Sequence, residues 1–472
     1  MMFHTIQFIA FAAAVWGLYQ LVLQYRLPRQ LLLLGASIAF YAAWKLTPLI
    51  VFGGYVGLCW LGGNLIMRLE TKWMRRAVTG VLVVELVGGL VAYKYLDLFT
   101  RSVISVMRWG GSSVEYEPMG LMLPLGMSFV TFQAIAYIVD IYRGQLRSEQ
   151  SLLKVAIHLL FFGQVVSGPI LRPSQLIAQL DKTPNVSEEE AATAIFRIAV
   201  GVAKKLLIAD VLAVTLVAPV FGNPAQYTSA ECLIAAIAYT FELYFDFSGY
   251  SDIAIGVAAL FGFKFPENFN KPYHATNLFE FWNRWHMSLS TWLRDYLYRP
   301  MGGSRDGKLR TLRNLFIVMA VGGLWHGSDW KFLVWGSVHG LLLVLWRIWW
   351  WQVGKPDEYT GYARTGAGWF FTFFLVVLSR IFFRSDSVSV ALVMFERLGM
   401  LTAGFANVSR TAWLSLAAAV FFYFLPKQVF SLSLRVFIAT PAFARGAALV
   451  GLGLLVRLLA QVETRPYIYF QF

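Results

Sequence analysis

The sequence predicts an all-α, polytopic integral membrane protein, and its composition and hydrophobic pattern support that fold class. Of the 472 residues, 58% are hydrophobic and only 14% are charged, whereas about a quarter of the residues in a soluble protein are charged. Apolar runs of about 20 residues, the length that crosses a bilayer, recur along the chain, and we count roughly ten to twelve. Because only short loops join them, we expect a single membrane domain over residues 1–472.

The first part of the chain contains a series of expected spans. The run over residues 6–23 has no charged region before it and no small-residue cleavage site, so we expect a retained span and not a removed signal peptide. Further spans are expected over residues 31–44, 48–67 and 78–96. Basic residues gather between positions 68 and 76, which favours the cytoplasmic side for that turn.

Polar residues interrupt the spans in the middle of the chain. An apolar helix is expected over residues 123–145, and glycines and a proline predict a broken or kinked helix over 158–172. Residues 181–190 are expected to form a solvated loop. The next span, 196–218, carries Lys204, Lys205 and Asp210. Snorkelling explains these lysines without any chemistry, but they would equally suit an anionic substrate.

Three carboxylates lie in the apolar segment 233–262, at Glu242, Asp246 and Asp252. Acidic side chains at membrane depth are costly unless they are paired or face water. We favour pairing with basic residues, or helix capping by Asp246 and Ser248. A metal site is conceivable, but no histidine lies beside these residues at ligand spacing.

The segment from His274 to Gly340 contains four of the six histidines. Drawn as a helix, residues 281–297 form an apolar stripe opposite a polar face, and His286 falls inside the stripe. A histidine there can exchange protons at cellular pH, since its ordinary pKa is about 6.5. The alternative is a core histidine that a single hydrogen bond satisfies.

His326 follows an apolar run and is flanked by Gly322, Gly323 and Gly327. Ionisable residues beside glycines at membrane depth are typical of an interrupted backbone that lines a cavity or water path. We therefore take a functional site as the default hypothesis here.

The loop over residues 299–313 has the highest density of basic residues, which predicts a cytoplasmic position. Its Arg305, Lys308 and Arg310 are also candidates for binding the phosphates of a ligand, with membrane topology as the alternative explanation. The later spans, over residues 369–383, 413–425 and 447–459, contain few polar residues besides Ser379, Arg380 and Arg384, and we interpret them as scaffold.

The cysteines and the net charge exclude some classes of function. Cys59 and Cys232 lie far apart in apolar stretches, which predicts neither a disulfide framework nor a metal cluster. The net charge of +14 resides in short loops between spans. Positive-inside topology and contact with anionic lipid explain that charge better than binding of nucleic acid.

Seven strings follow one another along the chain: LPLGMSFVTFQ, FFGQVVSGPILRP, GVAKKLLIAD, YFDFSGYSDIAIG, FWNRWHMSLSTWLRDYLYRPMGGSR, GGLWHG and the terminal YFQF. In this order they resemble the membrane-bound O-acyltransferase family, and within it the bacterial alginate O-acetyltransferase branch. The resemblance runs from about residue 120 to the C-terminus, whereas residues 1–110 match only in hydrophobic character.

The resemblance implies re-entrant or interfacial helices around a central tunnel in a bacterial inner-membrane protein. It implies that His326 in GGLWHG is the catalytic histidine and that His286 occupies the second site position. It also implies an acyl donor on the cytoplasmic side, with acetyl-CoA as the expected substrate and no bound cofactor or metal. Periplasmic partner proteins are expected to complete O-acetylation of a secreted polysaccharide such as alginate or cellulose.

The chemistry of acyl transfer fits these residues, because a neutral histidine in a low-dielectric site can take the hydroxyl proton. We expect His326 to be the general base and His286 to position the acceptor or polarise the acyl carbonyl. The amides of Gly322, Gly323 and Gly327, or the indole of Trp325, are candidates for stabilising the oxyanion.

Two other functions remain open. One is transfer of D-alanine or a lipid acyl group by the same fold. The other is transport of a polysaccharide or lipid precursor, with the intramembrane carboxylates and histidines as proton sites. Transporters often have two related halves, and inspection of the sequence finds none.

Overall fold

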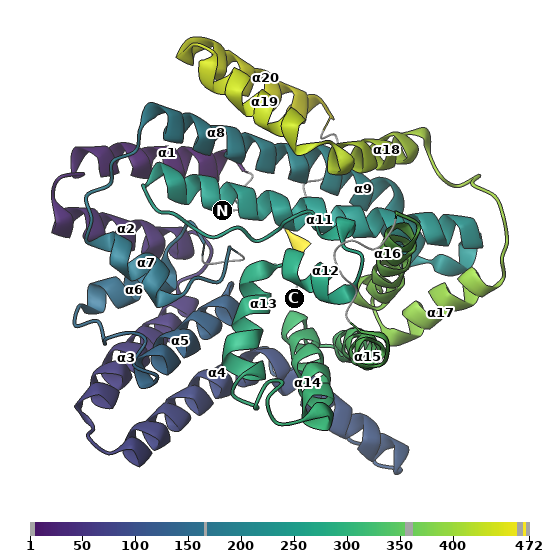
Figure 1. Cartoon of the computed structure of the whole chain (residues 1–472), viewed down its shortest axis with the longest axis horizontal. Coiled ribbons are helices and arrows are strands. Elements are labelled where there is room, and N and C mark those ends of the chain that lie inside the picture. Colours follow the sequence, from purple (N-terminus) through teal and green to yellow (C-terminus); the bar gives the residue numbers. More distant parts are fainter. Residues whose placement is uncertain (1–4, 165–167, 355–361, 460–465, 469–472) are drawn as a thin grey trace. The chain divides into compact units, whose positions relative to one another are not determined.

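The computed structural model describes residues 5–164, 168–354, 362–459 and 466–468, and all regular secondary structure in these ranges is helical (Figure 1). The prediction of an all-α protein is confirmed. The chain divides into two compact units. Unit 1 comprises residues 1–186 and 257–266, and unit 2 comprises residues 187–256 and 267–472. The single functional domain expected from the sequence stays a prediction.

The first four helices of unit 1 overlap the spans expected near the N-terminus, and residues 257–260, the end of a long helix of unit 2, also belong to unit 1. The helices are α1 (Ile6–Leu21), α2 (Arg26–Ala42), α3 (Thr47–Arg68), α4 (Lys72–Trp109), α5 (Met127–Tyr142), α6 (Leu152–Leu160) and α7 (Pro173–Leu180). The interruption predicted over residues 158–172 is confirmed, because α6 ends at Leu160 and the described residues that follow are not helical until Pro173.

Unit 2 contains the remaining helices, with several short π-helical and 3₁₀ turns between them. Its α-helices are α8 (Glu188–Ala203), α9 (Asp210–Leu212), α10 (Ala218–Gly222), α11 (Ser229–Leu260), α12 (Leu278–Arg284), α13 (Met287–Leu293), α14 (Lys308–His326), α15 (Trp330–Val353), α16 (Tyr362–Arg384), α17 (Val388–Gly399), α18 (Arg410–Phe424), α19 (Lys427–Ala439) and α20 (Ala442–Leu459). Its π-helical turns are η1 (Lys204–Ala209), η2 (Ala213–Val217) and η5 (Arg294–Tyr298), and its 3₁₀ turns are η3 (Pro224–Gln226) and η4 (Pro272–His274).

The loop expected over residues 181–190 is shorter in the structure than the sequence suggested. Helix α8 begins at Glu188, because Ser187 caps it: the Ser187 hydroxyl accepts from the Glu190 amide at 3.1 Å, and the Glu190 carboxylate accepts from the Ser187 amide at 3.0 Å. The three glutamates also lie at the positive end of the helix dipole, where negative charge is stabilising. They are therefore the first turn of a helix.

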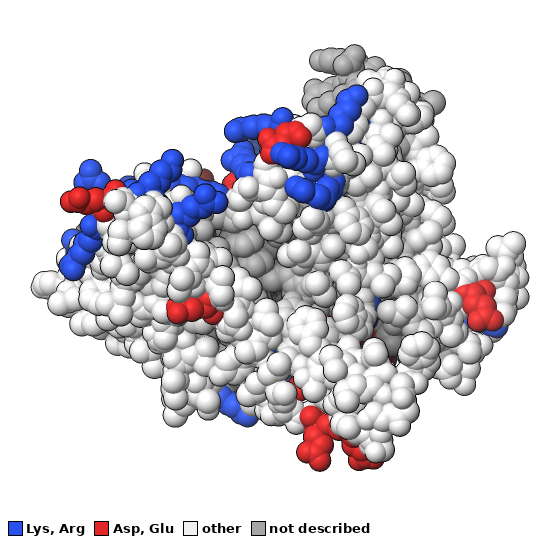
Figure 2. All heavy atoms as spheres, turned by 90° about the horizontal axis from the view of Figure 1, so that it is seen from below, with Lys and Arg blue, Asp and Glu red and all other residues white. Residues whose placement is uncertain are grey.

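The helices have the length and hydropathy of a membrane protein. Within the described ranges, five helical segments are long and apolar enough to cross a bilayer, or six if the bent pair α18 and α19 forms one span. Helices α1 and α5 are shorter and also apolar. Most of the surface in Figure 2 carries neither acidic nor basic side chains, as a surface in contact with lipid requires.

Helices α14 and α15 form a closely packed hairpin in unit 2 that positions His326. A Cβ atom on Gly323 would overlap the Phe332 carbonyl oxygen, and one on Gly336 would overlap that of Met319. Only glycine at these two positions allows the backbones to approach so closely. The hairpin turns at Gly327, directly after His326.

A candidate acyl-transfer site in unit 2

His326 is the last residue of α14, and aromatic rings surround it. Its side chain is 3% exposed. Its ring centroid lies 4.9 Å from Trp325, 5.1 Å from Trp335 and 5.2 Å from Phe383, and all three contacts are edge-on. The rings fix the imidazole in an apolar setting, which suits a neutral base.

A small void lies against His326. Its volume is about 10 Å³, and it is lined by Leu243, Phe281, Trp285, His326, Trp335, His339, Arg380 and Phe383. A space of this size holds about one water molecule. Any substrate that reaches His326 therefore requires movement of one of these side chains.

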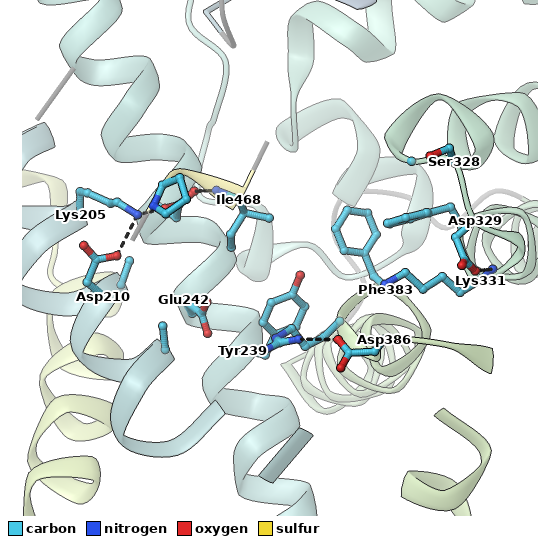
Figure 3. A pocket seen from close by; sticks show the side chains of 17 residues that line it. Lys205, Asp210, Tyr239, Glu242, Ser328, Asp329, Lys331, Phe383, Asp386 and Ile468 are labelled. Atoms are coloured by element: carbon cyan, nitrogen blue, oxygen red, sulfur yellow. Dashed lines mark hydrogen bonds and ion pairs between the residues drawn. The ribbon is translucent and has the colours of Figure 1, made fainter. Parts of the chain in front are cut away.

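A much larger polar cavity lies next to this void (Figure 3). Its volume is about 340 Å³, and α11, α16, the turn between α14 and α15, and the C-terminal residues all contribute to its wall. The lining residues are Lys205, Ala209, Asp210, Ala213, Tyr239, Glu242, Asp246, Gly327, Ser328, Asp329, Lys331, Phe332, Phe383, Arg384, Asp386, Pro466 and Ile468. Phe383 is the residue that the two linings share.

A buried ion-pair cluster forms one side of the polar cavity. The Lys205 ammonium lies 2.8 Å from Asp210 and 2.7 Å from Asp246, and the second oxygen of Asp246 accepts from the Ile468 amide at 3.0 Å. Lys205 is 1% exposed, so the snorkelling explanation is wrong for this residue. The reason is that the π-helical turn η1 places the side chain among carboxylates inside the unit.

The carboxylates of α11 are paired as the sequence predicted, with one exception. Asp246 pairs with Lys205, and Asp252 contacts Lys204 at 2.6 Å and Arg197 at 3.0 Å. The alternative of helix capping by Asp246 and Ser248 is wrong, since both residues lie inside α11. Glu242 also lines the cavity, but its Oε2 is buried and accepts no hydrogen bond from the described residues. Among those residues, no group of three or more histidine, cysteine or acidic side chains is arranged to hold a metal ion.

His286 lies at a break between two helices, whereas the sequence predicted one helix over residues 281–297. Helix α12 ends at Arg284, α13 begins at Met287, and His286 has a positive φ of 43°. The amide oxygen of Asn268 holds the break by accepting from the Ser288 amide at 3.2 Å and the Ser288 hydroxyl at 2.9 Å. The apolar stripe was a correct signal of burial, because His286 is 0% exposed.

Asn268 also determines the tautomer of His286. The two side chains meet at 3.1 Å between Nδ1 of the histidine and Oδ1 of the asparagine. Because the Ser288 amide can only donate, the atom that it faces must be the amide oxygen of Asn268. Nδ1 of His286 therefore carries the proton, and Nε2 carries the lone pair.

The two predicted histidines contact the same tryptophan, but only His326 lines one of the two spaces. The ring of Trp325 lies 6.1 Å from that of His286 and 4.9 Å from that of His326. His286 does not line either of the two spaces described above. The structure thus connects the histidines through Trp325.

The basic candidates Arg305, Lys308 and Arg310 are exposed and lie at the opposite end of α14 from His326. Arg310 pairs loosely with Asp306 at 3.4 Å, and the Lys308 ammonium lies 5.4 Å from the Trp351 ring. Helix α14 has 19 residues, and a rise of 1.5 Å per residue puts its ends about 27 Å apart. These basic residues therefore do not belong to the immediate surroundings of His326.

The sequence interpretation missed the polar residues that α15 and α16 bring to His326. His339 and Arg380 both line its void, and His339 Nε2 lies 2.9 Å from the Ser379 hydroxyl. The sequence interpretation places Arg380 in scaffold, because the span around it contains few polar residues. The available signal was the arginine itself, because charged residues are rare in membrane segments and usually have a function there.

Known proteins resemble the chain over most of its length. Residues 143–384, which include both predicted histidines and Arg380, match the sequence model of the membrane-bound O-acyltransferase family. The "Probable alginate O-acetylase AlgI" of Pseudomonas aeruginosa is 38% identical over 379 residues, which cover 78% of this chain and 69% of the relative. The terminal YFQF string of the sequence interpretation lies outside the described residues.

The names of two further relatives give an acceptor other than alginate or a transferred group other than acetyl. The peptidoglycan O-acetyltransferase of Helicobacter pylori is 31% identical over 404 residues, covering 80% of this chain and 75% of the relative. The teichoic acid D-alanyltransferase of Bacillus subtilis is 29% identical over 305 residues, covering 60% of this chain and 75% of the relative.

Proposed function

The chain belongs to the membrane-bound O-acyltransferase family, and from that premise we propose that it transfers acetyl groups to hydroxyls of a cell-surface polysaccharide. The observation that carries the proposal is the position of His326, which is buried at the wall of a small void beside a cavity of about 340 Å³. A base that is shielded from water but close to a space for an acceptor suits transfer to a hydroxyl over hydrolysis.

In the proposed reaction, His326 takes the proton of the acceptor hydroxyl while the hydroxyl oxygen attacks the acyl carbonyl carbon. The carbonyl π electrons move onto its oxygen and form a tetrahedral oxyanion. When the carbonyl re-forms, the bond from carbon to the leaving sulfur breaks, and the thiolate takes the proton back from His326. The products are an acetyl ester and a free thiol, and the histidine returns to its neutral form.

We propose acetyl-CoA as the donor and the basic loop around Arg305, Lys308 and Arg310 as its first contact. Guanidinium and ammonium groups are suited to the phosphates of coenzyme A. The exposure of these side chains supports this role, but the distance of about 27 Å along α14 means that the acyl group must travel to reach His326.

His286 has a supporting role in the proposal. Its ring contacts Trp325, and Asn268 fixes its tautomer, so His286 and Asn268 together hold the indole beside His326. Direct contact between His286 and the substrate is the alternative role. Substitution of His286 distinguishes the two roles. If His286 contacts the substrate, its loss should change turnover for every acceptor. If it only positions Trp325, a side chain of similar shape should restore part of the turnover.

We further propose the bacterial inner membrane as the location and extracytoplasmic O-acetylation proteins as partners. The names of the alginate O-acetylase and peptidoglycan O-acetyltransferase relatives support a polysaccharide acceptor. Transfer of D-alanine is the second candidate, and the likeness to a teichoic acid D-alanyltransferase is the observation that favours it.

The first test compares esters on surface polysaccharide from cells that produce the wild type, His326→Gln or His158→Gln. His158 is the matched control, because it is also a fully buried histidine but belongs to α6 of unit 1. Loss of a general base lowers the rate about 100-fold to 10,000-fold, so we expect His326→Gln to remove acetate released by mild alkali. His158→Gln should retain it.

The same extracts discriminate between the candidates. Release of D-alanine in place of acetate would favour the second candidate. Normal acetylation by a His326→Gln protein that is present at wild-type level would exclude His326 as the base.

A further inference from the structure

Arg380 is a buried cation that faces the void beside His326. It lies in α16, its side chain is 3% exposed, and it lines the same space of about 10 Å³ as the histidine. One guanidinium nitrogen, Nη1, donates to the Thr240 carbonyl at 3.0 Å and to the Tyr273 hydroxyl. The guanidinium carbon also lies 4.4 Å from the Trp285 ring centroid. These contacts hold the group in one orientation.

No carboxylate of the described residues balances this charge. Arg380 forms no ion pair with them, and its Nε and Nη2 groups form no hydrogen bond with them. Lys205 shows the contrast, because it is equally buried and pairs with two carboxylates. A buried cation without a counter-ion is costly, so its presence beside a catalytic void indicates that an anion completes the site.

The backbone amides near His326 are not available to donate hydrogen bonds to such an anion. Gly322 and Gly323 lie inside α14, where amides donate along the helix, and the Gly327 amide donates to the Leu324 carbonyl at 3.2 Å. As it stands, the void beside Arg380 has room for about one oxygen atom. The anion that suits this space is therefore an oxyanion that forms on the oxygen of a bound acyl group.

We propose that Arg380 is a catalytic residue that donates hydrogen bonds from Nε or Nη2 to the oxyanion of the tetrahedral intermediate. This inference rests on the proposed acyl transfer. As the acceptor oxygen bonds to the acyl carbon, the carbonyl electron pair moves onto oxygen, and the guanidinium stabilises that negative charge. His326 holds the acceptor proton meanwhile. Collapse of the intermediate returns the electron pair to the carbonyl, expels the thiolate and leaves Arg380 unchanged.

The test measures acetyl transfer by purified, reconstituted wild type and Arg380→Ala, with and without added guanidinium or urea. Loss of one oxyanion donor costs about 100-fold to 1,000-fold in kcat, and we expect this loss with little change in the KM for the donor. Guanidinium should restore part of the turnover because it replaces the charge. Urea has a similar planar shape without charge and should restore none.

Arg347→Ala is the matched control for loss of an arginine. Arg347 also lies over aromatic rings, at 4.8 Å from Phe279 and 5.8 Å from Trp350, but it lines neither space. We expect its kcat to stay close to the wild-type value. If Arg380→Ala does not fold, Arg380→Lys and Arg380→Met replace it, and the lysine variant should turn over faster than the methionine variant.

Several results would overturn the inference. Wild-type kcat in Arg380→Ala would show that the charge is dispensable, and equal rescue by urea would show that the side chain only fills space. A rise in KM at unchanged kcat would assign Arg380 to substrate binding. Absence of transfer by the wild type itself would instead contradict the proposed function, so the two failures are distinguishable.

Discussion

The position of Phe383 determines what reaches His326. Its ring lies 5.2 Å from His326, 5.1 Å from Phe332 and 5.0 Å from Trp335, and it is 2% exposed. It is a wall residue of both the polar cavity and the His326 void. Because the two spaces share this side chain, we expect the Phe383 ring to keep water in the polar cavity from the base.

Substitution of Phe383 by leucine should make the protein a poorer transferase and a better hydrolase. The smaller side chain would connect the two spaces, so that water competes with the acceptor for the acyl group. The measurement is the ratio of free acetate to acetylated acceptor formed from labelled donor.

Phe382→Leu is the matched control, because Phe382 contacts Phe395 at 5.2 Å and lines neither space. The same product ratio in both variants would contradict the role of Phe383 as a partition.

At the residue scale, the sequence could indicate single candidates but not the contacts between them. His326 could be singled out as a candidate because it interrupts an apolar run between glycines. Arg380 could not be connected with it, because their proximity depends on the packing of α14, α15 and α16. The pairing of Lys205 with Asp246 is a similar case, since forty-one residues separate them and only the fold brings them within 2.7 Å.

At the scale of elements, the hairpin of α14 and α15 sets the position of the site. Gly323 and Gly336 let the two backbones meet, and His326 lies three residues beyond the first of them. A residue larger than glycine at the contact must push the helices apart. The site then moves with the end of α14.

Gly336→Ala should therefore lower both stability and turnover. The added Cβ would overlap the Met319 carbonyl oxygen, and overpacking of this kind costs about 1–3 kcal/mol. Thermal unfolding in detergent and acetyl transfer are the two measurements.

Gly35→Ala in α2 is the control, because a Cβ there meets nothing within 4 Å, and it should unfold at or above the wild-type temperature. An unchanged melting temperature for Gly336→Ala would contradict the close-packing account.

The break at His286 shows why element boundaries were harder to predict than burial. The pattern of apolar residues over 281–297 fits a helix on both sides of the break. Asn268, which lies outside that segment, stabilises the interruption through the Ser288 amide and the His286 ring. A long-range hydrogen bond of this kind leaves no periodic signal in the sequence.

At the scale of the whole molecule, hydrophobicity alone was enough to predict the fold class. The high apolar content and the repeated long apolar runs could only be buried in lipid or against other helices. The order of motifs then predicted the family that residues 143–384 match. Chemistry inside unit 2 was less predictable, because it depends on which polar side chains from distant helices face the same space.

The central claim is that the protein is an acetyltransferase in which His326 is the base. The most direct measurement is transfer of label from acetyl-CoA to a polysaccharide acceptor by the purified protein in liposomes, with extracytoplasmic partner proteins supplied. Wild type and His326→Ala are compared after both pass the same thermal unfolding check. We expect the wild type to form labelled ester and release coenzyme A, and His326→Ala to do neither. Equal formation of labelled ester by the two proteins would contradict the account.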